Sequence, residues 1–411
     1  MEPVGVIGEG QDKLMVFGRE CFFKELDELK RHFQMHLFDF ENLDEENFHG
    51  LLEYSGRLDI KKVFGISQID QMYHFTMNKA LGFEIYSQRA LLHGFNKHLS
   101  RKAEVNPFWF TDIDPADDDD VSVSKIKEWP FIFKNTSLCS GISHYLVKTP
   151  EQFKTILADY RRNDKLLVQM ERIHTLITDG MKEEELPLLP PFIAEHFIPD
   201  LTKTIEFTYE GYVTEDGRLI DYGIAEETYF KNQEIFMYFM PPISFPKDRA
   251  SELSDWVKGF IDNLYKEGFK NQFFNIEFWL MEDGSFVMTE FNPRCAWPYQ
   301  PNYRSTFGVS LLEDAVNLTI RKQEPKRLPW NDWLEDRIVK PSAAVVIATS
   351  ETGRVGDLFD YEYCRSLEKK LPCVWFERGE NEILTTADQT KAGTQVITLW
   401  IEANSLRELF D

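Results

Sequence analysis

The chain has 411 residues, of which 43% are hydrophobic and 14% aromatic, which is enough apolar material for about two to four packed units. Its formal net charge of -23 argues against a protein that binds nucleic acid or anionic membranes, because no basic excess exists to neutralise phosphate groups. A local nucleotide site remains compatible with this charge.

The cysteines predict neither a disulfide framework nor a zinc site, because they are odd in number and show no C-x-x-C spacing: Cys21, Cys139, Cys295, Cys364 and Cys373. The N-terminal "MEPVGVIGEGQDK" lacks a basic segment followed by a long apolar run, and no apolar stretch reaches membrane-spanning length. We therefore expect a cytoplasmic protein with neither membrane nor nucleic-acid partners.

The first part of the chain alternates strand-like and helix-like segments. "PVGVIGEG" (3–10) and "KKVFGIS" (61–67) have the short apolar runs of strands, and "QIDQMYHFTMNKALGF" (68–83) has a helical pattern. This alternation predicts a small α/β domain over residues 1–95. The pair Gly8 and Gly10 is better explained as a strand-to-loop turn than as a dinucleotide fingerprint, because G-x-G alone is a weak signal.

The middle and the end of the chain show three breaks. "DIDPADDDD" (112–120) is interpreted as a solvated turn in preference to a metal site. "KEEELPLLPP" (182–191) and "KQEPKRLPWNDWLEDR" (322–337) are proline-containing connections. "SAAVVIATS" (342–350) and the apolar runs after it predict a small strand-rich C-terminal lobe.

A helix followed by a hairpin is predicted between residues 248 and 294. Within "DRASELSDWVKGFIDNLYKEG" (248–268), Gly268 is placed to end a helix whose apolar positions recur at helical spacing: Leu253, Trp256, Val257, Phe260, Ile261 and Leu264. "FFNIEFWLMEDGSFVMTEFNPR" (273–294) follows, with two strand-like runs joined by Asp283-Gly284, a strong hairpin signal.

This hairpin carries two glutamates among apolar residues. A two-residue turn at Asp283-Gly284 places three pairs opposite each other: Glu282 and Ser285, Glu277 and Glu290, and Asn275 and Asn292. Directly opposed Cβ atoms are about 4.5–5.5 Å apart, where like charges repel. A divalent cation removes the difficulty, because two carboxylates and an amide oxygen suit Mg²⁺. The alternative, a protonated carboxyl or a solvent-facing pair, fits the flanking "FF", "FWL" and "FVM" less well.

The hairpin resembles the metal-binding hairpin of the ATP-grasp superfamily, which carries a glutamate on one strand and E-x-N-x-R on the next. Other pieces follow in the family order. "GFNKHLSRK" (94–102) resembles the helix start with the first ATP-contacting lysine, and "EWPFIFKNTSLCSGISHYLVKTPEQF" (128–153) resembles the lid with its phosphate-covering loop. "FIAEHFIPDLTKTIEFTYEGYVTEDG" (192–217) resembles the adenine hinge and the first central strand. The resemblance covers nearly the whole chain and is greatest to the L-amino-acid ligases, which join amino acids into dipeptides.

The resemblance implies the residues of a phosphoryl-transfer site. Mg²⁺, or Mn²⁺ in its place, would be held against the ATP phosphates by Glu277, Glu290 and Asn292. Arg294 would contact the γ-phosphate and the developing acyl phosphate, a geometry suited to a guanidinium fork. The phosphate oxygens would be neutralised by Lys97 and Lys134. Of these residues, the ones acting most directly in catalysis would be Arg294, Lys134 and Glu290.

The resemblance also implies the adenosine contacts. Glu195 would accept from the adenine amino group, the backbone around His196 and Ile198 would pair with the ring edge, and Glu206 would hold the ribose hydroxyls. The structural alternatives are ordinary surface carboxylates at Glu195 and Glu206, and a lysine at 134 that only extends its amine to the sheet edge.

The sequence departs from the family pattern in three places. The phosphate-covering loop "NTSLCSG" has one glycine, Gly141, so its cradle would rely on the hydroxyls of Ser137 and Ser140. A second candidate hinge strand, "KLLVQMERI" (165–173), precedes the preferred one and would replace Glu195 by Glu171.

The third departure follows Arg294, where "CAWP" replaces a common glycine pair. Trp297 could wall an amino-acid pocket there or pack in the core. Arg304 and His144 are further candidates for substrate contacts.

The sequence therefore predicts an α/β protein with the ATP-grasp fold. Its expected parts are a pre-ATP-grasp parallel-sheet domain (1–95), a connecting helical segment (96–128), a mobile lid (129–197), a central antiparallel-sheet domain (198–322) and the C-terminal lobe (323–411). The expected activity is ATP-dependent ligation of a small carboxylate to an amine, with homo-oligomers compatible. An ATP-binding regulatory protein and an ATP-grasp kinase are the alternatives.

Overall fold

The computed structural model of the chain describes residues 3–18, 24–38, 45–67, 70–83, 85–137, 144–162, 165–198, 204–229, 235–385 and 393–411. These ranges contain three sheets of four, four and eight strands. A separate two-stranded ribbon is formed by β15 (Gly353–Arg354) and β17 (Ile383–Leu384). No helix in these ranges is both long enough and apolar enough to cross a membrane.

The N-terminal sheet has the strand order β1-β3-β2-β4. Strand β2 is parallel to β3 and β4, and β1 pairs antiparallel with β3, so the predicted parallel sheet is confirmed except at its first strand. The elements are β1 (Gly5–Ile7), β2 (Asp12–Phe17), η1 (Lys24–Arg31), β3 (Phe33–Phe38), α2 (Glu45–Leu58), β4 (Lys62–Gly65), α3 (Asp70–Ala80), α4 (Gln88–Phe95) and α5 (Lys97–Ala103).

The second sheet forms the lid, with all of its strands antiparallel in the order β5-β8-β6-β7. Its elements are β5 (Phe110–Ile113), α6 (Asp119–Ser124), β6 (Phe131–Asn135), β7 (His144–Val147), α7 (Pro150–Arg162), α8 (Lys165–Thr178), η2 (Glu183–Glu185) and β8 (Phe192–His196). Strand β5 comes from the segment expected to connect domains, so the lid sheet begins earlier than predicted.

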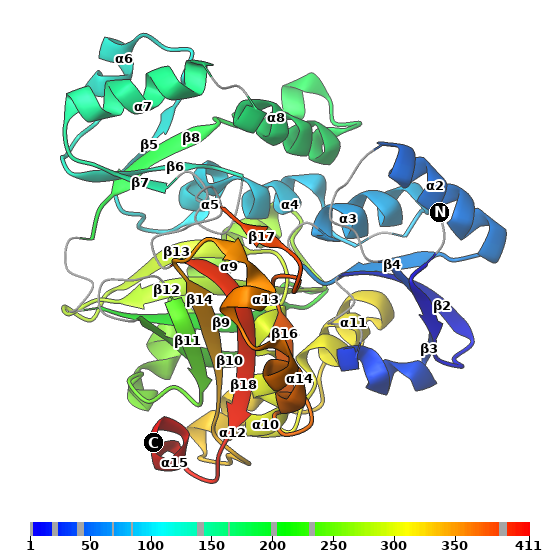
Figure 1. Ribbon diagram of the computed structural model, residues 1–411. Helices are drawn as coiled ribbons and strands as arrows, with labels where there is room; N and C mark the ends of the chain where they lie inside the picture. The colour runs from blue at the N-terminus through cyan, green and yellow to red at the C-terminus, as the bar shows by residue number, and fades with distance from the viewer. Residues whose placement is uncertain are drawn as a thin grey trace.

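The two faces of the lid sheet differ because side chains alternate along each strand. Phe131 and Phe133 of β6 pack with Phe192 of β8 in a core under α7. Lys134 is one position after Phe133 and Glu195 is three positions after Phe192, so both project from the opposite face. Figure 1 shows that this sheet stands above the central sheet, with α7 on its outer side.

The third sheet has eight strands in the order β13-β12-β9-β10-β11-β14-β18-β16. The strands are β9 (Ile205–Val213), β10 (Leu219–Tyr229), β11 (Ile235–Met240), β12 (Gln272–Leu280), β13 (Phe286–Asn292), β14 (Ser342–Thr349), β16 (Cys373–Phe376) and β18 (Thr394–Glu402). The helices are η4 (Lys247–Arg249), α9 (Ala250–Lys266), η5 (Trp297–Tyr299), α10 (Gln300–Phe307), α11 (Leu311–Arg321), α12 (Pro329–Leu334), α13 (Val355–Leu358), α14 (Tyr361–Leu367) and α15 (Leu406–Phe410).

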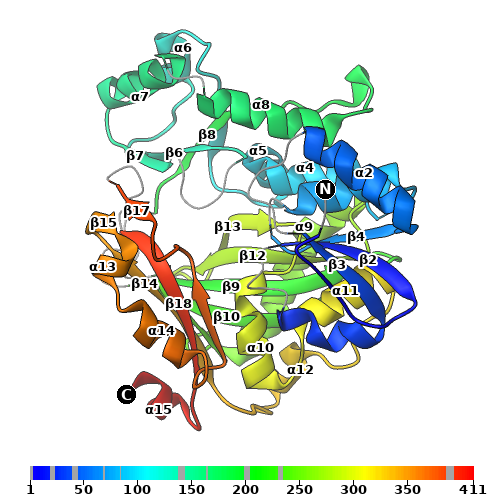
Figure 2. The same cartoon turned by 45° about the vertical axis from the view of Figure 1, so that its right-hand side comes forward.

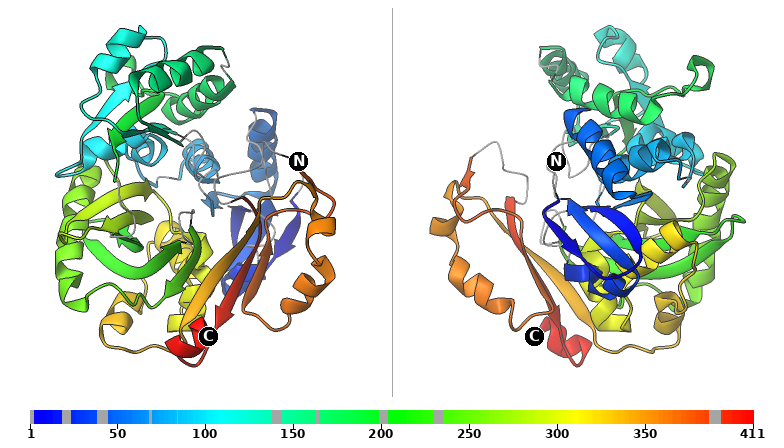
Figure 3. Two further views of the ribbon diagram at one scale, coloured as in Figure 1. Left: turned by 60° about the vertical axis from the view of Figure 1, so that its left-hand side comes forward. Right: turned by 90° about the vertical axis from the view of Figure 1, so that its right-hand side faces the viewer.

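The C-terminal strands continue the central sheet. Strand β11 pairs antiparallel with β14, from Met237 opposite Val345 to Met240 opposite Ser342. Figures 2 and 3 show β14 and β18 extending the sheet beneath the lid. The predicted lobe is therefore rich in strands, but it shares a sheet with the central domain.

Helix α9 covers the face of the hairpin strands opposite to the one that carries Glu277. Val257 and Ile261 are completely buried, and the ring of Trp256 lies 5.7 Å from that of Phe278 on β12. The helix ends at Lys266, and Gly268 follows it with a φ of 94°, which confirms both the helical pattern and the predicted stop.

Candidate active site

The opposed glutamates of the hairpin are confirmed. Strands β12 and β13 pair antiparallel, with Glu277 opposite Glu290 and Asn275 opposite Asn292. The two asparagines are buried, and Nδ2 of Asn292 donates to Oδ1 of Asn275 at 3.3 Å. Two carboxylates and two amides therefore share one face at the end of the hairpin.

The predicted two-residue turn is wrong, although the glutamate register is right. The backbone N–H of Gly284 donates to the carbonyl of Met281 at 2.9 Å, and that of Met281 donates to Ser285 at 2.9 Å, so three residues form the loop. Gly284 has a φ of 85°, as expected for a hairpin whose last loop residue is left-handed. Ser285 therefore pairs with Met281, and not with Glu282 as expected.

A β-bulge restores the register between the turn and the site. Glu277 pairs with Glu290, but Phe278 pairs with Met288, which leaves Thr289 as the extra residue on β13. The three-residue loop shifts the pairing of β12 with β13 by one residue relative to a two-residue turn. The extra residue of the bulge shifts the pairing back by one residue. Sequence reasoning reached the right pairs because these two deviations cancel.

The two glutamates of the pair have different electrostatic surroundings. Nζ of Lys97 lies 3.1 Å from Oε1 of Glu290. Burial opposes ionisation of Glu290, but Lys97, Lys134 and Arg294 outweigh it and hold the pKa of that carboxyl below its ordinary value. Burial and then repulsion from Glu290 raise the pKa of Glu277 well above its ordinary value. Without a cation, only one member of the pair is therefore readily charged.

Lys134 and Glu195, the candidate phosphate and adenine contacts, form an ion pair on the lid sheet. Lys134 pairs with Oε1 of Glu195, and Nε of Arg101 lies 3.0 Å from Oε2 of the same carboxylate. Burial would raise the pKa of Glu195, but Arg101 and Lys134 lower it to about 2. Each carboxylate oxygen has two lone pairs, so these contacts leave acceptor capacity for an adenine amino group.

Arg101 joins the lid to the hairpin that carries Glu277 and Glu290. This arginine is 6% exposed and lies on α5, one turn after Lys97. Its side chain also contacts Glu104 at 2.9 Å, and Nη2 donates to the backbone carbonyl of Thr289 at 2.8 Å. Sequence reasoning missed Arg101, and its position four residues after Lys97 was the signal that could have found it.

The candidate hinge residues lie on and directly after β8. Glu195 and His196 are the last residues of this strand, and the partly buried Ile198 follows it. The backbone N–H of His196 donates to Trp109 at 3.0 Å. The rival segment, with Glu171, forms the helix α8, so the choice of the second hinge candidate agrees with the structure.

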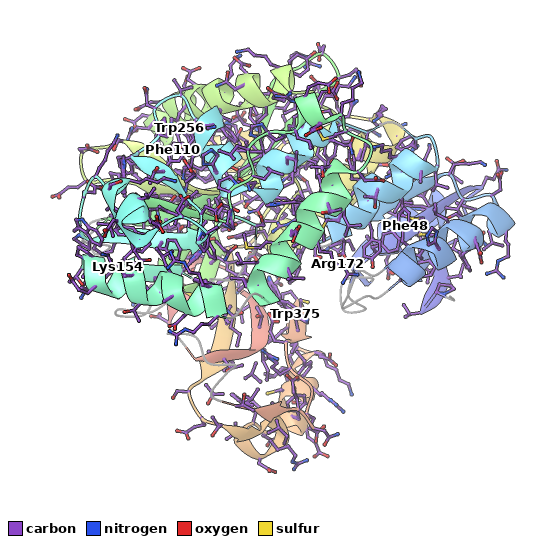
Figure 4. All side chains as sticks on the ribbon, turned by 90° about the horizontal axis from the view of Figure 1, so that it is seen from above. Phe48, Phe110, Lys154, Arg172, Trp256 and Trp375 are labelled. Carbon is purple, nitrogen blue, oxygen red and sulfur yellow. The ribbon has the colours of Figure 1, made fainter. Side chains whose placement is uncertain are left out.

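The phosphate-covering loop is described only at its start. Ser137 is partly buried, and its hydroxyl lies 2.6 Å from Nε2 of His174 on α8. Ser140 and Gly141 lie outside the described residues. Seen from above, α8 with Arg172 runs between α7 of the lid and α2 of the N-terminal domain (Figure 4).

Glu206 lies on the same face of the central sheet as Glu277 and Glu290. It is 4% exposed, and Oγ1 of Thr289 donates to its Oε1 at 3.1 Å. In the antiparallel register of β9 and β12, Glu277 is opposite Thr208 and Trp279 is opposite Glu206. Glu206 therefore sits diagonally across from Glu277.

Arg294 is held at the far end of the hairpin. Its Nη2 donates to Oδ1 of Asn292 at 3.4 Å, while its buried Nε has no hydrogen-bond partner among the described residues. Glu210, which is 1% exposed, accepts from the backbone N–H of Ala296 at 2.9 Å and from Asn275 at 3.0 Å. Burial raises the pKa of Glu210 to about 8.

Of the three remaining candidates for substrate contacts, Trp297 lies near the site and the other two side chains are exposed on the surface. The ring of Trp297 lies 4.6 Å from that of Trp375 on β16, so the C-terminal strands reach this side of the site. Arg304 lies on the exposed surface of α10, and His144 is exposed at the start of β7.

Two further carboxylates, Glu210 and Glu227, were also missed. Both are buried on the sheet face that carries the glutamate pair. Glu206, Thr208 and Glu210 occupy every second position of β9, so their side chains lie on one face of the sheet. This alternation was the sequence pattern that could have identified Glu210. The described residues contain no group of three or more histidine, cysteine, aspartate or glutamate side chains arranged to hold a metal ion. The candidate metal ligands are thus the Glu277 and Glu290 pair with an amide.

The comparisons with known proteins concern the fold. No protein-family model and no curated protein matches the chain. Among solved structures, an L-amino acid ligase from Bacillus licheniformis aligns with a TM-score of 0.69 and 11% identity, over 97% of this chain and 95% of its own. An N5-carboxyaminoimidazole synthetase from Staphylococcus aureus complexed with ADP aligns with a TM-score of 0.65 and 12% identity, also over 97% and 95%.

A phosphoribosylglycinamide synthetase from Anaerococcus prevotii aligns with a TM-score of 0.58 and 14% identity, over 97% of this chain and 96% of its own. All three alignments run through the lid, the central sheet and the C-terminal strands, since they cover nearly the whole chain. The protein therefore has the ATP-grasp fold, as the sequence predicts.

Proposed function

We propose that this protein is an ATP-dependent carboxylate–amine ligase that forms an amide through an acyl phosphate and releases ADP and phosphate. Amino acids are the proposed substrates, by analogy with the similar L-amino acid ligase. The observation that carries the proposal is the opposed pair Glu277 and Glu290, which shares a sheet face with Asn292, whose amide oxygen accepts from Arg294. Lys97 extends to this pair from the adjoining helix.

The side chains present fit a magnesium ion. Glu277 is a buried carboxyl whose ionisation Glu290 opposes, and the Asn292 amide oxygen lies on the same face. Hard oxygen ligands of this kind suit Mg²⁺ or Mn²⁺. Glu277, Glu290 and Asn292 would hold the ion, which when bound offsets charge on the phosphate oxygens.

The chain's own groups would then position ATP and the carboxylate substrate. Lys97 and Lys134 contact phosphate oxygens, and Glu206 holds the ribose. One oxygen of the substrate carboxylate attacks the γ-phosphorus, the bond to the β–γ bridging oxygen breaks, and ADP leaves. Arg294, whose Nε has no partner among the described residues, is placed to bind the transferring group.

The second step forms the amide. The nitrogen of the amine attacks the acyl carbon, the carbon–oxygen bond to phosphate breaks, and the amine loses a proton. No protein nucleophile takes part. Water would hydrolyse the acyl phosphate, so closure of the lid over the site protects the intermediate.

The test is to incubate the protein with ATP, Mg²⁺ and a pool of amino acids, and to search for a condensed amide by mass spectrometry. An amide with ADP and phosphate supports the ligase. A phosphorylated amino acid would identify a kinase, and nucleotide binding without any product would identify a regulatory protein. Changing Glu277 or Glu290 to alanine should abolish amino-acid-dependent ADP release while the circular dichroism spectrum is retained.

A further inference from the structure

A second pair of opposed glutamates lies on the same sheet face. In the antiparallel register of β9 and β10, Glu206 is directly opposite Glu227. Opposed residues have Cβ atoms about 4.5–5.5 Å apart, where like charges destabilise the sheet. Because Glu206 is diagonal to Glu277, both pairs lie on the same face of the sheet.

Glu227, like Glu206 opposite it, has no lysine or arginine partner among the described residues. It is 6% exposed, Tyr299 donates to its Oε1, and its buried Oε2 has no hydrogen-bond partner among the described residues. Burial raises the pKa of Glu227 to about 7.

Three other carboxylates of the site have a positive partner or neighbour, whereas Glu206 has none among the described residues and accepts from Thr289. Glu290 has Lys97 at 3.1 Å, and Glu195 has Arg101 at 3.0 Å. The charge of Arg294 acts on Glu210. Within the described residues, Glu227 forms no ion pair with a lysine or arginine. A buried carboxylate of this kind is stable when a ligand brings the missing positive charge.

We propose that Glu227 binds the ammonium group of the amine substrate. This inference rests on the proposed ligase function and names the residue that selects a charged amine. Glu206 lies opposite on the neighbouring strand, where burial and Glu227 raise the pKa of its carboxyl well above the ordinary value, and the rings of Tyr299 and Tyr238, 4.6 Å apart, flank the position.

The surroundings favour an ammonium group over a second divalent ion. Oε1 of Glu227 is already used by the Tyr299 hydroxyl, so Oε2 is the oxygen that is left. An ammonium group can donate one of its three N–H groups to this oxygen and is attracted to aromatic faces. Divalent ions such as Mg²⁺ instead require about six oxygen ligands.

The experiment compares a charged and an uncharged nucleophile in Glu227→Gln. The charged nucleophile is the amino acid that gives an amide in the screen above. The uncharged one is hydroxylamine, which is neutral at pH 7.5 and traps the acyl phosphate as a hydroxamate. The variant should lose about tenfold or more in kcat/KM for the amino acid, because a charge-assisted hydrogen bond is removed. Hydroxamate formation and the KM for ATP should stay within about twofold of wild type. Hydroxylamine carries no positive charge for Glu227 to bind, and the substitution leaves the proposed ATP contacts unchanged.

Glu226→Gln is the matched control. Glu226 is the preceding residue of β10, is also 6% exposed, and points to the other face. Its carboxylate accepts from the backbone N–H groups of Ile243 at 2.8 Å and Ser244 at 2.7 Å. This control should lower the Tm and leave the KM for the amino acid unchanged. Glu227→Asp keeps the charge and should retain part of the amine affinity, which covers the case in which the glutamine variant folds poorly.

Three results would overturn the proposal. The first is an unchanged KM for the amino acid in Glu227→Gln, and the second is an equal loss of amide and hydroxamate formation. The third is recovery of amide formation in raised Mg²⁺, which would assign the pair to a metal ion. If wild type makes neither amide nor hydroxamate from any amino acid, the ligase function itself fails, and the site loses its basis with it.

Discussion

Arg101 donates a 2.8 Å hydrogen bond to the backbone carbonyl of Thr289, the extra residue of the bulge next to Glu290. The same guanidinium holds Glu195, which pairs with Lys134 on the lid. One buried side chain thus connects Glu195, Lys134 and the hairpin of the opposed glutamates, which are the proposed adenine, phosphate and metal contacts.

We predict that Arg101→Ala weakens MgATP binding by about tenfold or more and destabilises the fold by about 3 kcal/mol or more, because Glu195 loses a buried partner. Arg101→Lys should recover part of the stability and less of the affinity, since lysine cannot reproduce the fork. Calorimetric titration with MgATP and thermal unfolding measure both. Arg172→Ala, an exposed arginine on α8, is the control. Normal MgATP affinity in Arg101→Ala would contradict the positioning role.

Glu277→Gln should change stability in opposite directions with and without nucleotide. Burial and repulsion from Glu290 raise the pKa of Glu277, so the neutral glutamine should raise the Tm of the free protein. The same change removes a metal ligand, so the Tm increase on adding MgATP should shrink. Differential scanning fluorimetry with ATP plus EDTA and with ATP plus Mg²⁺ separates the two effects. A variant stabilised by MgATP as strongly as wild type would exclude Glu277 as a ligand.

The raised pKa of Glu210 predicts a pH effect on stability. Its folded pKa is about 8 and its ordinary value 4.5, so between these values the folded state binds the extra proton. The contribution to stability is complete below about pH 4.5 and is lost as the pH rises towards 8. Glu210→Gln should therefore gain in Tm relative to wild type as the pH increases through this window. Parallel Tm curves for the two proteins between pH 5 and 8 would refute the assignment.

Two glycines should respond to alanine with opposite signs. Gly284 closes the hairpin loop with a φ of 85°, where alanine costs about 1–2 kcal/mol. Gly56 lies exposed within α2 with open space around its Cα, so alanine should stabilise the helix by up to about 1 kcal/mol. Urea unfolding of the two variants measures both changes, and destabilisation by Gly56→Ala would show that the helix packs differently from the structure.

The fold and the centre of the site could be predicted because their signals are local. The alternating apolar runs around Glu277 and Glu290 fix which residues share a face, and the Asp283-Gly284 turn signal brings the strands together. The exact loop length was not predictable, since a three-residue loop with a bulge gives the same register at the glutamates as a two-residue turn.

The partners of the site could not be predicted because they come from distant segments. Arg101 reaches Thr289 across 188 positions of sequence, and Tyr299 reaches Glu227 across 72. Such contacts depend on how the sheets are placed in three dimensions, which the period of a single strand does not encode.

The pairing of β11 with β14 has a consequence for how the molecule can be divided. Cutting the chain before Ser342 would remove three strands from an eight-stranded sheet and uncover the backbone N–H and C=O groups of β11. An open edge of that kind invites pairing between molecules. A shortened protein that keeps every proposed ATP ligand would thus be expected to aggregate, so the last seventy residues cannot be treated as a detachable appendage.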